Sequence, residues 1–153
     1  MLVLLNDKQY NKNNIILLDR NTNAVMNNGY FHRMYYSNQH FTMNGIYLHY
    51  NLDNIVIQED FNKIVIFMQN NYYNFIYESI KNIEKGIANK YYPYMKKVFV
   101  SKIADYFGNN KIRLFNDNHI KNGTYEGKKL ILKMSGLWET ENQYGVTFKL
   151  LLS

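Results

Sequence analysis

The stretch that most constrains the fold of this chain is its last quarter, residues 128–152, because it carries two strand patterns joined by a turn. In each half, large apolar residues recur at the period of two that a half-buried strand requires. These residues are Leu130, Leu132 and Met134 in the first half and Val146, Phe148 and Leu150 in the second. Gly136 and Gly145 bracket the expected tip. The pattern predicts a β-hairpin whose tip carries Trp138, the only tryptophan, where its ring can either cap a barrel end or stack on a ligand.

Short strand patterns separated by asparagine-rich turns fill the first part of the chain. The expected strands are Leu2–Leu5, Ile15–Leu18, Tyr30–Tyr36, Gly45–Asn51 and Lys63–Met68, with a further strand at Lys111–Phe115. Turns are expected at residues 11–14, 27–29 and 44–45. We see no linker, repeat or charge block that would divide residues 1–153, and we therefore expect a single domain.

The middle of the chain has the period of a helix, from about residue 72 to residue 90. Four isoleucines recur at steps of four, three and four, which places them on one stripe; they are Ile76, Ile80, Ile83 and Ile87. Asn70 or Asn71 is the expected N-cap, and Pro93 is expected to fix the helix end. A short second helix is expected at Ser101–Phe107, with Ser101 as its cap and Gly108 as its left-handed stop. Strands around one main helix predict an α+β, mainly β fold, and this order of elements is compatible with an OB barrel and also with an α+β sandwich.

Net charge, cysteine content and apolar runs limit the partners and cellular settings that we expect for this chain. The net charge of +6 makes a polyanionic partner plausible, although the abundance of Asn, Lys, Ile and Tyr also fits the coding bias of an AT-rich genome. With no cysteine, disulfides and thiolate zinc sites are excluded, and an intracellular or intravirion setting fits better than secretion. The apolar runs are too short for a signal peptide or a membrane span, so we expect no membrane association.

No catalytic pattern emerges from the sequence. The four histidines lack the spacing of metal ligands, and Asp117 with His119 has no second carboxylate beside it. Glu139 and Glu141 lie two residues apart in the expected turn, which is typical of a solvated tip. There is no glycine-rich phosphate loop. We therefore expect no enzyme activity, no metal and no cofactor.

The hairpin also resembles a known signature. The family concerned consists of short proteins of large DNA viruses and virus-derived elements, in which a small-Gly-hydrophobic-Trp-Glu run is followed by Tyr-Gly-hydrophobic-Thr-aromatic-Lys. Residues 135–139 and 144–149 match these two runs, and the resemblance extends upstream through residues 81–92 and 111–115, over roughly the C-terminal half. It implies an OB-like barrel, with the main helix between strands, that binds single-stranded DNA at a viral replication site in the host nucleus or cytoplasm.

A protein that holds single-stranded nucleic acid without reading its sequence needs flat rings for the bases and cations for the phosphates. The candidate residues are Trp138, Tyr144, Tyr47, Arg33, Lys111, Arg113, Lys133 and Lys149. We expect Trp138 to stack on a base, with Arg113 and Lys133 contacting phosphate. Each residue alone also fits a simpler role, a ring in the core or a solvated cation, and only clustering on one sheet face would strengthen the set.

Two functions from different classes follow. The first is sequence-nonspecific binding of single-stranded DNA in viral DNA replication or genome maintenance, with RNA and a homo-oligomer left open. The alternative is a virion structural or assembly protein that binds other proteins through its β surface.

Overall fold

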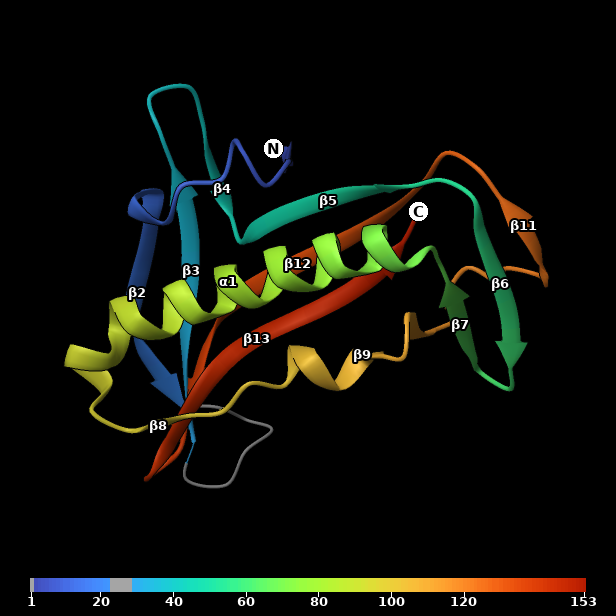
Figure 1. Ribbon diagram of the computed structural model, residues 1–153. Coiled ribbons are helices and arrows are strands. Elements are labelled where there is room, and N and C mark those ends of the chain that lie inside the picture. The colour runs from blue at the N-terminus through green and yellow to red at the C-terminus, as the bar shows by residue number, and fades with distance from the viewer. Residues whose placement is uncertain (1, 23–28) are drawn as a thin grey trace.

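The computed structural model describes residues 2–22 and 29–153, and its architecture is α+β and mainly β, as predicted. The strands form two sheets, and one long helix, α1 (Asn70–Met95), lies across the larger one (Figure 1). Part of the turn expected at 27–29 lies outside the described residues. In the described part of the chain no helix is both long enough and apolar enough to cross a membrane.

The eight-stranded sheet is organised around the C-terminal hairpin. Its members are β1 (Leu4–Leu5), β2 (Ile15–Thr22), β3 (Tyr30–Ser37), β4 (Thr42–Asn44), β5 (Ile46–Leu52), β8 (Val98–Phe99), β12 (Lys128–Glu139) and β13 (Gln143–Leu152). β12 pairs with β13 along one edge. Along its other edge it pairs first with β5 and then with β3, and the change of partner falls at Ser135, where the register with β13 shifts. The predicted hairpin is confirmed, and it is central to the sheet.

The five-stranded sheet lies at the opposite end of the molecule from β2 (Figure 1). Its strands, in spatial order, are β11 (Gly123–Tyr125), β6 (Ile55–Asp60), β7 (Lys63–Phe67), β10 (Lys111–Phe115) and β9 (Phe107–Gly108). Side chains that point to one of its faces, among them Ile57, Ile66 and Ile112, are fully buried. This face therefore closes one side of the common core.

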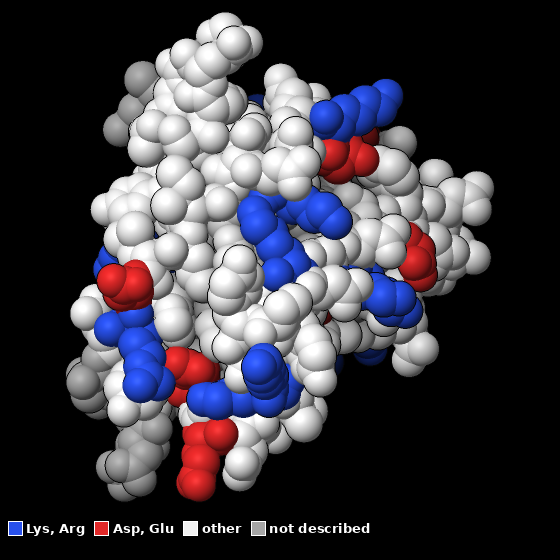
Figure 2. Space-filling model, turned by 90° about the vertical axis from the view of Figure 1, so that its left-hand side faces the viewer, with Lys and Arg blue, Asp and Glu red and all other residues white. Residues whose placement is uncertain are grey.

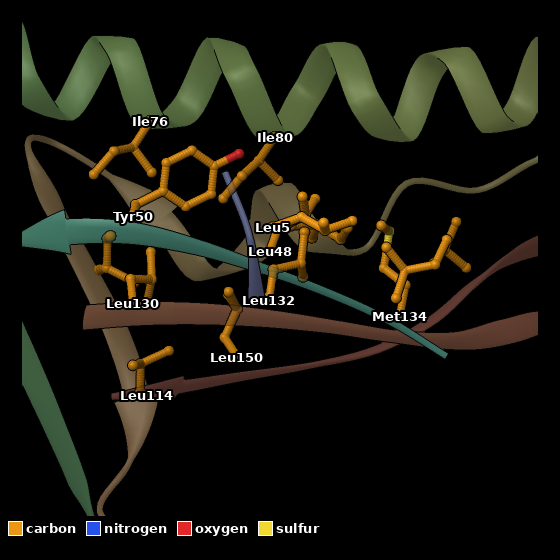
Figure 3. Packing of buried hydrophobic residues seen from close by; sticks show 14 of the residues in the cluster. Leu5, Leu48, Tyr50, Ile76, Ile80, Leu114, Leu130, Leu132, Met134 and Leu150 are labelled. Carbon is orange, nitrogen blue, oxygen red and sulfur yellow. The ribbon is translucent and has the colours of Figure 1, made fainter. Parts of the chain in front are cut away.

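The main core lies between α1 and the eight-stranded sheet. Figure 3 shows Ile76 and Ile80 of α1 above Leu48 of β5, Leu132 of β12 and Leu150 of β13, all of them buried. The predicted isoleucine stripe therefore packs on the sheet, with Ile83 only partly buried at its margin. Burial of each such side chain contributes about 1.5–3 kcal/mol.

The ends of α1 differ from the prediction. The N-cap is Gln69 and makes no side-chain hydrogen bond, so the assignment of Asn70 or Asn71 was wrong. Pro93 lies inside the helix, which continues to Met95 and ends at the left-handed Lys96. A proline lacks one N–H and so forfeits one backbone hydrogen bond. So close to the end of the helix, this loss does not stop the last turn.

The second predicted helix is only a 3-10 turn, η2 (Ile103–Tyr106). Ser101 does not cap it, because its hydroxyl binds the carboxylate of the buried Glu84 on α1. Gly108 is not a left-handed stop, since it belongs to β9 and its φ is not positive. The hydrogen bond between Ser101 and Glu84 therefore holds this segment in place, although its local sequence only weakly specifies its structure.

Several strand boundaries also changed. β1 is shorter than the expected Leu2–Leu5, β2 is longer than Ile15–Leu18, and β4, β6, β8, β9 and β11 were not predicted. The hairpin tip is at residues 140–142, so Gly136, Trp138 and Gly145 lie within strands and not at the tip. The reason is that β12 runs four residues past the bulge at Ser135, paired with β3.

Candidate nucleic-acid interface

The two faces of the eight-stranded sheet have different surroundings. Side chains alternate between faces along each strand, and residues opposite one another in register share a face. Leu48 and Leu132 are paired and fully buried beneath α1. Their neighbours in sequence, Tyr47 and Lys133, therefore point to the side away from α1, which we call the outer face.

A row of predicted binding residues crosses the outer face. Tyr47 of β5, Lys133 of β12 and Lys149 of β13 are direct register partners across three adjacent strands. The Lys133 Nζ lies 5.6 Å from the centroid of the Tyr47 ring, within cation–π range. The Lys149 side chain is 60% exposed, and its Nζ lies 3.4 Å from the Asp117 carboxylate. The structure thus brings together one ring and two cations that are far apart in sequence.

Arg33 and Trp138 extend the outer face toward the hairpin tip. Arg33 is the register partner of Gly136, and Trp138 is the partner of both Phe31 and Gly145. The Arg33 guanidinium lies 5.8 Å from the centroid of the Phe31 ring and donates to the Asn44 Oδ1 at 3.2 Å. Five of the eight predicted residues therefore point to the same face of one sheet.

Trp138 is packed and not free. It is only 7% exposed, and its ring lies against Gly145, where a Cβ atom would come within 2.6 Å of the ring. The Nζ of Lys102 lies 4.7 Å from the ring centroid. Of the two roles that its sequence position suggested, this geometry favours packing, and stacking on a base would require Lys102 to move aside.

Tyr144 lies on the other face, beneath α1. It is 1% exposed, and its hydroxyl donates to the Ala88 carbonyl oxygen at 2.7 Å. Its ring meets that of Phe99 edge to face at 5.2 Å, and burial raises the pKa of the phenol. A ring enclosed in this way presents no surface to a base, so Tyr144 is a core residue in this structure.

Lys111 and Arg113 are on the outer side of the five-stranded sheet, separate from the row. Arg113 forms an ion pair with Asp60 at 3.2 Å, and the Lys63 Nζ lies 5.2 Å from the centroid of the Phe115 ring. Arg113, Lys63 and Phe115 line a cleft of about 420 Å³, and Lys102, Tyr106 and Phe148 are also among its lining residues. Lys102 contacts Trp138 as well, and it therefore links this cleft to the outer face.

Glu139, expected at a solvated tip, is instead buried on the α1 side. Lys97 Nζ lies 2.8 Å from its carboxylate, His32 Nε2 3.0 Å and Arg20 3.4 Å. Burial would raise the pKa of Glu139, but hydrogen bonds from Lys97 and His32, with their positive charges, outweigh it and hold the pKa below its ordinary value. This cluster could not be predicted from the sequence, because its members are 12 to 119 positions apart.

No family model, curated protein or solved structure matches this chain. Within residues 2–22 and 29–153, no group of three or more His, Asp or Glu side chains is placed to hold a metal ion.

Proposed function

We propose that the protein binds single-stranded nucleic acid, DNA in the first instance, on the outer face of its eight-stranded sheet. The observation that carries the proposal is the row of Tyr47, Lys133 and Lys149, which lie side by side on three paired strands. Neighbouring strands are about 4.8 Å apart, so the row spans roughly 10 Å. A chain of phosphates and bases can contact both cations and the ring at once across such a distance.

The charge and chemistry of this face suit a ligand without a fixed sequence. Base stacking on aromatic side chains tolerates every base, and lysines contact phosphates irrespective of sequence. Arg33 of β3, the register partner of Gly136, adds an exposed cation to the outer face. By its resemblance to the viral family, we further propose a role in viral DNA replication or genome maintenance. An OB-like barrel stays a proposal, supported by the place of α1 between two groups of strands.

Titration of the protein with fluorescent oligonucleotides, single-stranded and duplex, at several salt concentrations tests this proposal. We expect tighter binding of the single strand and a steep fall of affinity with salt. Lys133→Ala and Lys149→Ala should each reduce the salt slope by about 0.7, the value for one phosphate contact on a single strand. Tyr47→Leu should weaken binding by about 1–3 kcal/mol with little change in the salt slope.

Lys85→Ala is the matched control, because Lys85 is an exposed lysine of α1, which covers the opposite side of the sheet. It should leave both affinity and salt slope unchanged. Binding that is insensitive to salt, or an equal loss in Lys85→Ala and Lys133→Ala, would rule out this face as the binding site.

One observation favours the alternative, a protein that binds other proteins in an assembly. The outer side of the five-stranded sheet carries exposed Val56 and Phe115, and Phe61 is fully exposed at the turn between β6 and β7. Large apolar groups gathered on one surface are typical of contact sites. Self-association in sedimentation experiments, together with the absence of oligonucleotide binding at low salt, would support this function in place of the first.

A further inference from the structure

A wide hollow lies on the α1 side of the sheet, where the buried Glu139 cluster is found. It has a volume of about 890 Å³ and is bounded by β2, β3 and the last turns of α1. These elements lie at the left of Figure 1, and Figure 2 looks at that side of the molecule, where basic side chains gather at the centre and, with acidic neighbours, along the lower part. Such a volume is typical of small-molecule sites. We call this hollow the tip groove.

The tip groove has an excess of positive charge. Arg20, Lys90, Lys97 and His32 line it, against Asp19 and Glu139. The His32 Nδ1 faces the Leu18 carbonyl oxygen at 3.1 Å and its Nε2 faces the Glu139 carboxylate at 3.0 Å. Without His32, the three cations outnumber the two carboxylates by one, and this excess favours an anionic ligand.

Arg20 is the cation most accessible to such an anion. Its side chain is 53% exposed, and its only carboxylate contact among the described residues is the 3.4 Å approach of one nitrogen to Glu139. The centre of the guanidinium lies 4.0 Å from the centroid of the Tyr30 ring, within cation–π range, and within the described part of the chain its N–H groups donate to Glu139 alone. A planar, always-charged fork of this kind is well suited to a phosphate.

An aromatic wall lies on the other side of the tip groove. Tyr94 is 82% exposed, and its ring centroid is 6.4 Å from that of Tyr91, which is buried. Both residues line the tip groove together with Arg20. An exposed ring that faces a group of cations is suited to a ligand with a flat apolar part and a compact anionic part.

We propose that the tip groove binds a nucleoside monophosphate group, with the phosphate at Arg20 and Lys97 and the base against Tyr94. The group can come from a free nucleotide or from the 5′-phosphorylated end of a strand, since the two have the same chemistry. This site is separate from the outer face, because Glu139 and Trp138 are adjacent in β12 and point to opposite sides of the sheet. It does not depend on the function proposed above.

Isothermal titration with adenosine 5′-monophosphate, adenosine and inorganic phosphate tests the site. We expect the monophosphate to bind at least tenfold more tightly than adenosine. Arg20→Ala should weaken monophosphate binding about tenfold or more, in line with the loss of a charge-assisted hydrogen bond. Tyr94→Ala should weaken it at least fivefold while leaving inorganic phosphate binding unchanged.

Tyr92→Ala is the matched control, since Tyr92 is an exposed tyrosine of the same helix that lines a different depression. Melting curves by circular dichroism establish that each variant is folded. No binding of the monophosphate by the wild type, or equal affinities in wild type and Arg20→Ala, would overturn the proposal, and so would an equal loss in Tyr92→Ala and Tyr94→Ala.

Oligonucleotides with and without a 5′-phosphate distinguish the two sources. If the protein binds the phosphorylated strand more tightly and Arg20→Ala abolishes this difference, the ligand is the strand end. If it binds the monophosphate but shows no such difference, the ligand is a free nucleotide. Lys133→Ala should weaken binding of the unphosphorylated strand and leave the monophosphate unaffected. The experiments therefore distinguish a negative result for the tip groove from a negative result for the outer face.

Discussion

The contact between Trp138 and Gly145 allows a sharp test of the packing on the outer face. A Cβ atom at Gly145 would lie 2.6–2.8 Å from three atoms of the Trp138 ring, nearer than non-bonded atoms approach. In Gly145→Ala the ring therefore has to shift. Forced overpacking of this kind costs about 1–3 kcal/mol. For a chain of 153 residues we expect the melting temperature to fall by roughly 2–12 °C.

The same substitution should behave differently when the ring is absent. In a Trp138→Ala background, itself destabilised by about 3–5 kcal/mol, the three ring atoms nearest to the new methyl group are gone. Alanine is favoured over glycine in a strand by roughly 0.5–1 kcal/mol, so Gly145→Ala should there become neutral or stabilising. The coupling free energy of this double-mutant cycle should reach about 1.5–4 kcal/mol.

Urea unfolding followed by far-ultraviolet circular dichroism measures all four proteins, including those without a tryptophan. Gly108→Ala is the matched control, because Gly108 is also in a strand and a Cβ atom there would meet nothing within 4 Å. It should be neutral or slightly stabilising. If Gly145→Ala has the same cost in both backgrounds, within about 0.5 kcal/mol, the ring does not rest on Gly145 and the reasoning fails.

Three further predictions concern the same hairpin. Glu139→Gln should destabilise the protein at pH 7 by about 3 kcal/mol, because it leaves Lys97 and His32 without their partner. The pKa of Glu139 is lower in the folded state, so its contribution to stability is complete above the ordinary pKa of 4.5 and is lost as the pH falls through the lower folded value. Urea midpoints measured between pH 3 and pH 7 should show this loss of stability in the wild type and a smaller loss in the variant. Gly136→Ala should cost more than about 3 kcal/mol, because its Cβ atom would collide with the His32 carbonyl oxygen of the paired strand, and a soluble protein with an unchanged melting temperature would contradict this. Deletion of residues 144–153 removes Val146, Leu150 and Leu152 from the core and should give insoluble protein, whereas a soluble product with a cooperative melt would show that β13 is dispensable.

The elements with a strong period could be predicted from the sequence. The alternation around Leu130 and Leu132 and the isoleucine stripe of α1 persist long enough to indicate both type and buried face. β6 was missed because only the two isoleucines at 55 and 57 mark its buried side before the polar residues 58–60. Two-residue strands such as β8 are fixed only by their partners, since they are too short to have a period.

The candidate site was harder to predict, because it depends on register. Tyr47, Lys133 and Lys149 become neighbours only once β5, β12 and β13 pair in one particular way, and a shift of one residue would turn Lys133 into the core. The surroundings of Glu139 were hard to predict for the same reason. Its polar neighbours in sequence suggested a solvated turn, whereas its actual partners, Arg20, His32 and Lys97, come from three distant segments.

The central place of β12 has a consequence for how the protein is made. Tyr50 of β5 pairs with Leu130, a residue 80 positions later in the chain. At translation rates of roughly 5–20 residues per second, β5 waits about 4–16 s on the ribosome before β12 has been synthesised. During that interval the edge of β5 has no partner strand from the hairpin. Leu48 and Tyr50 of β5, which are buried in the folded protein, are then not covered by it. Nascent chains should therefore be the form of this protein most dependent on chaperones, and synonymous codons that slow elongation between β5 and β12 should lower its soluble yield.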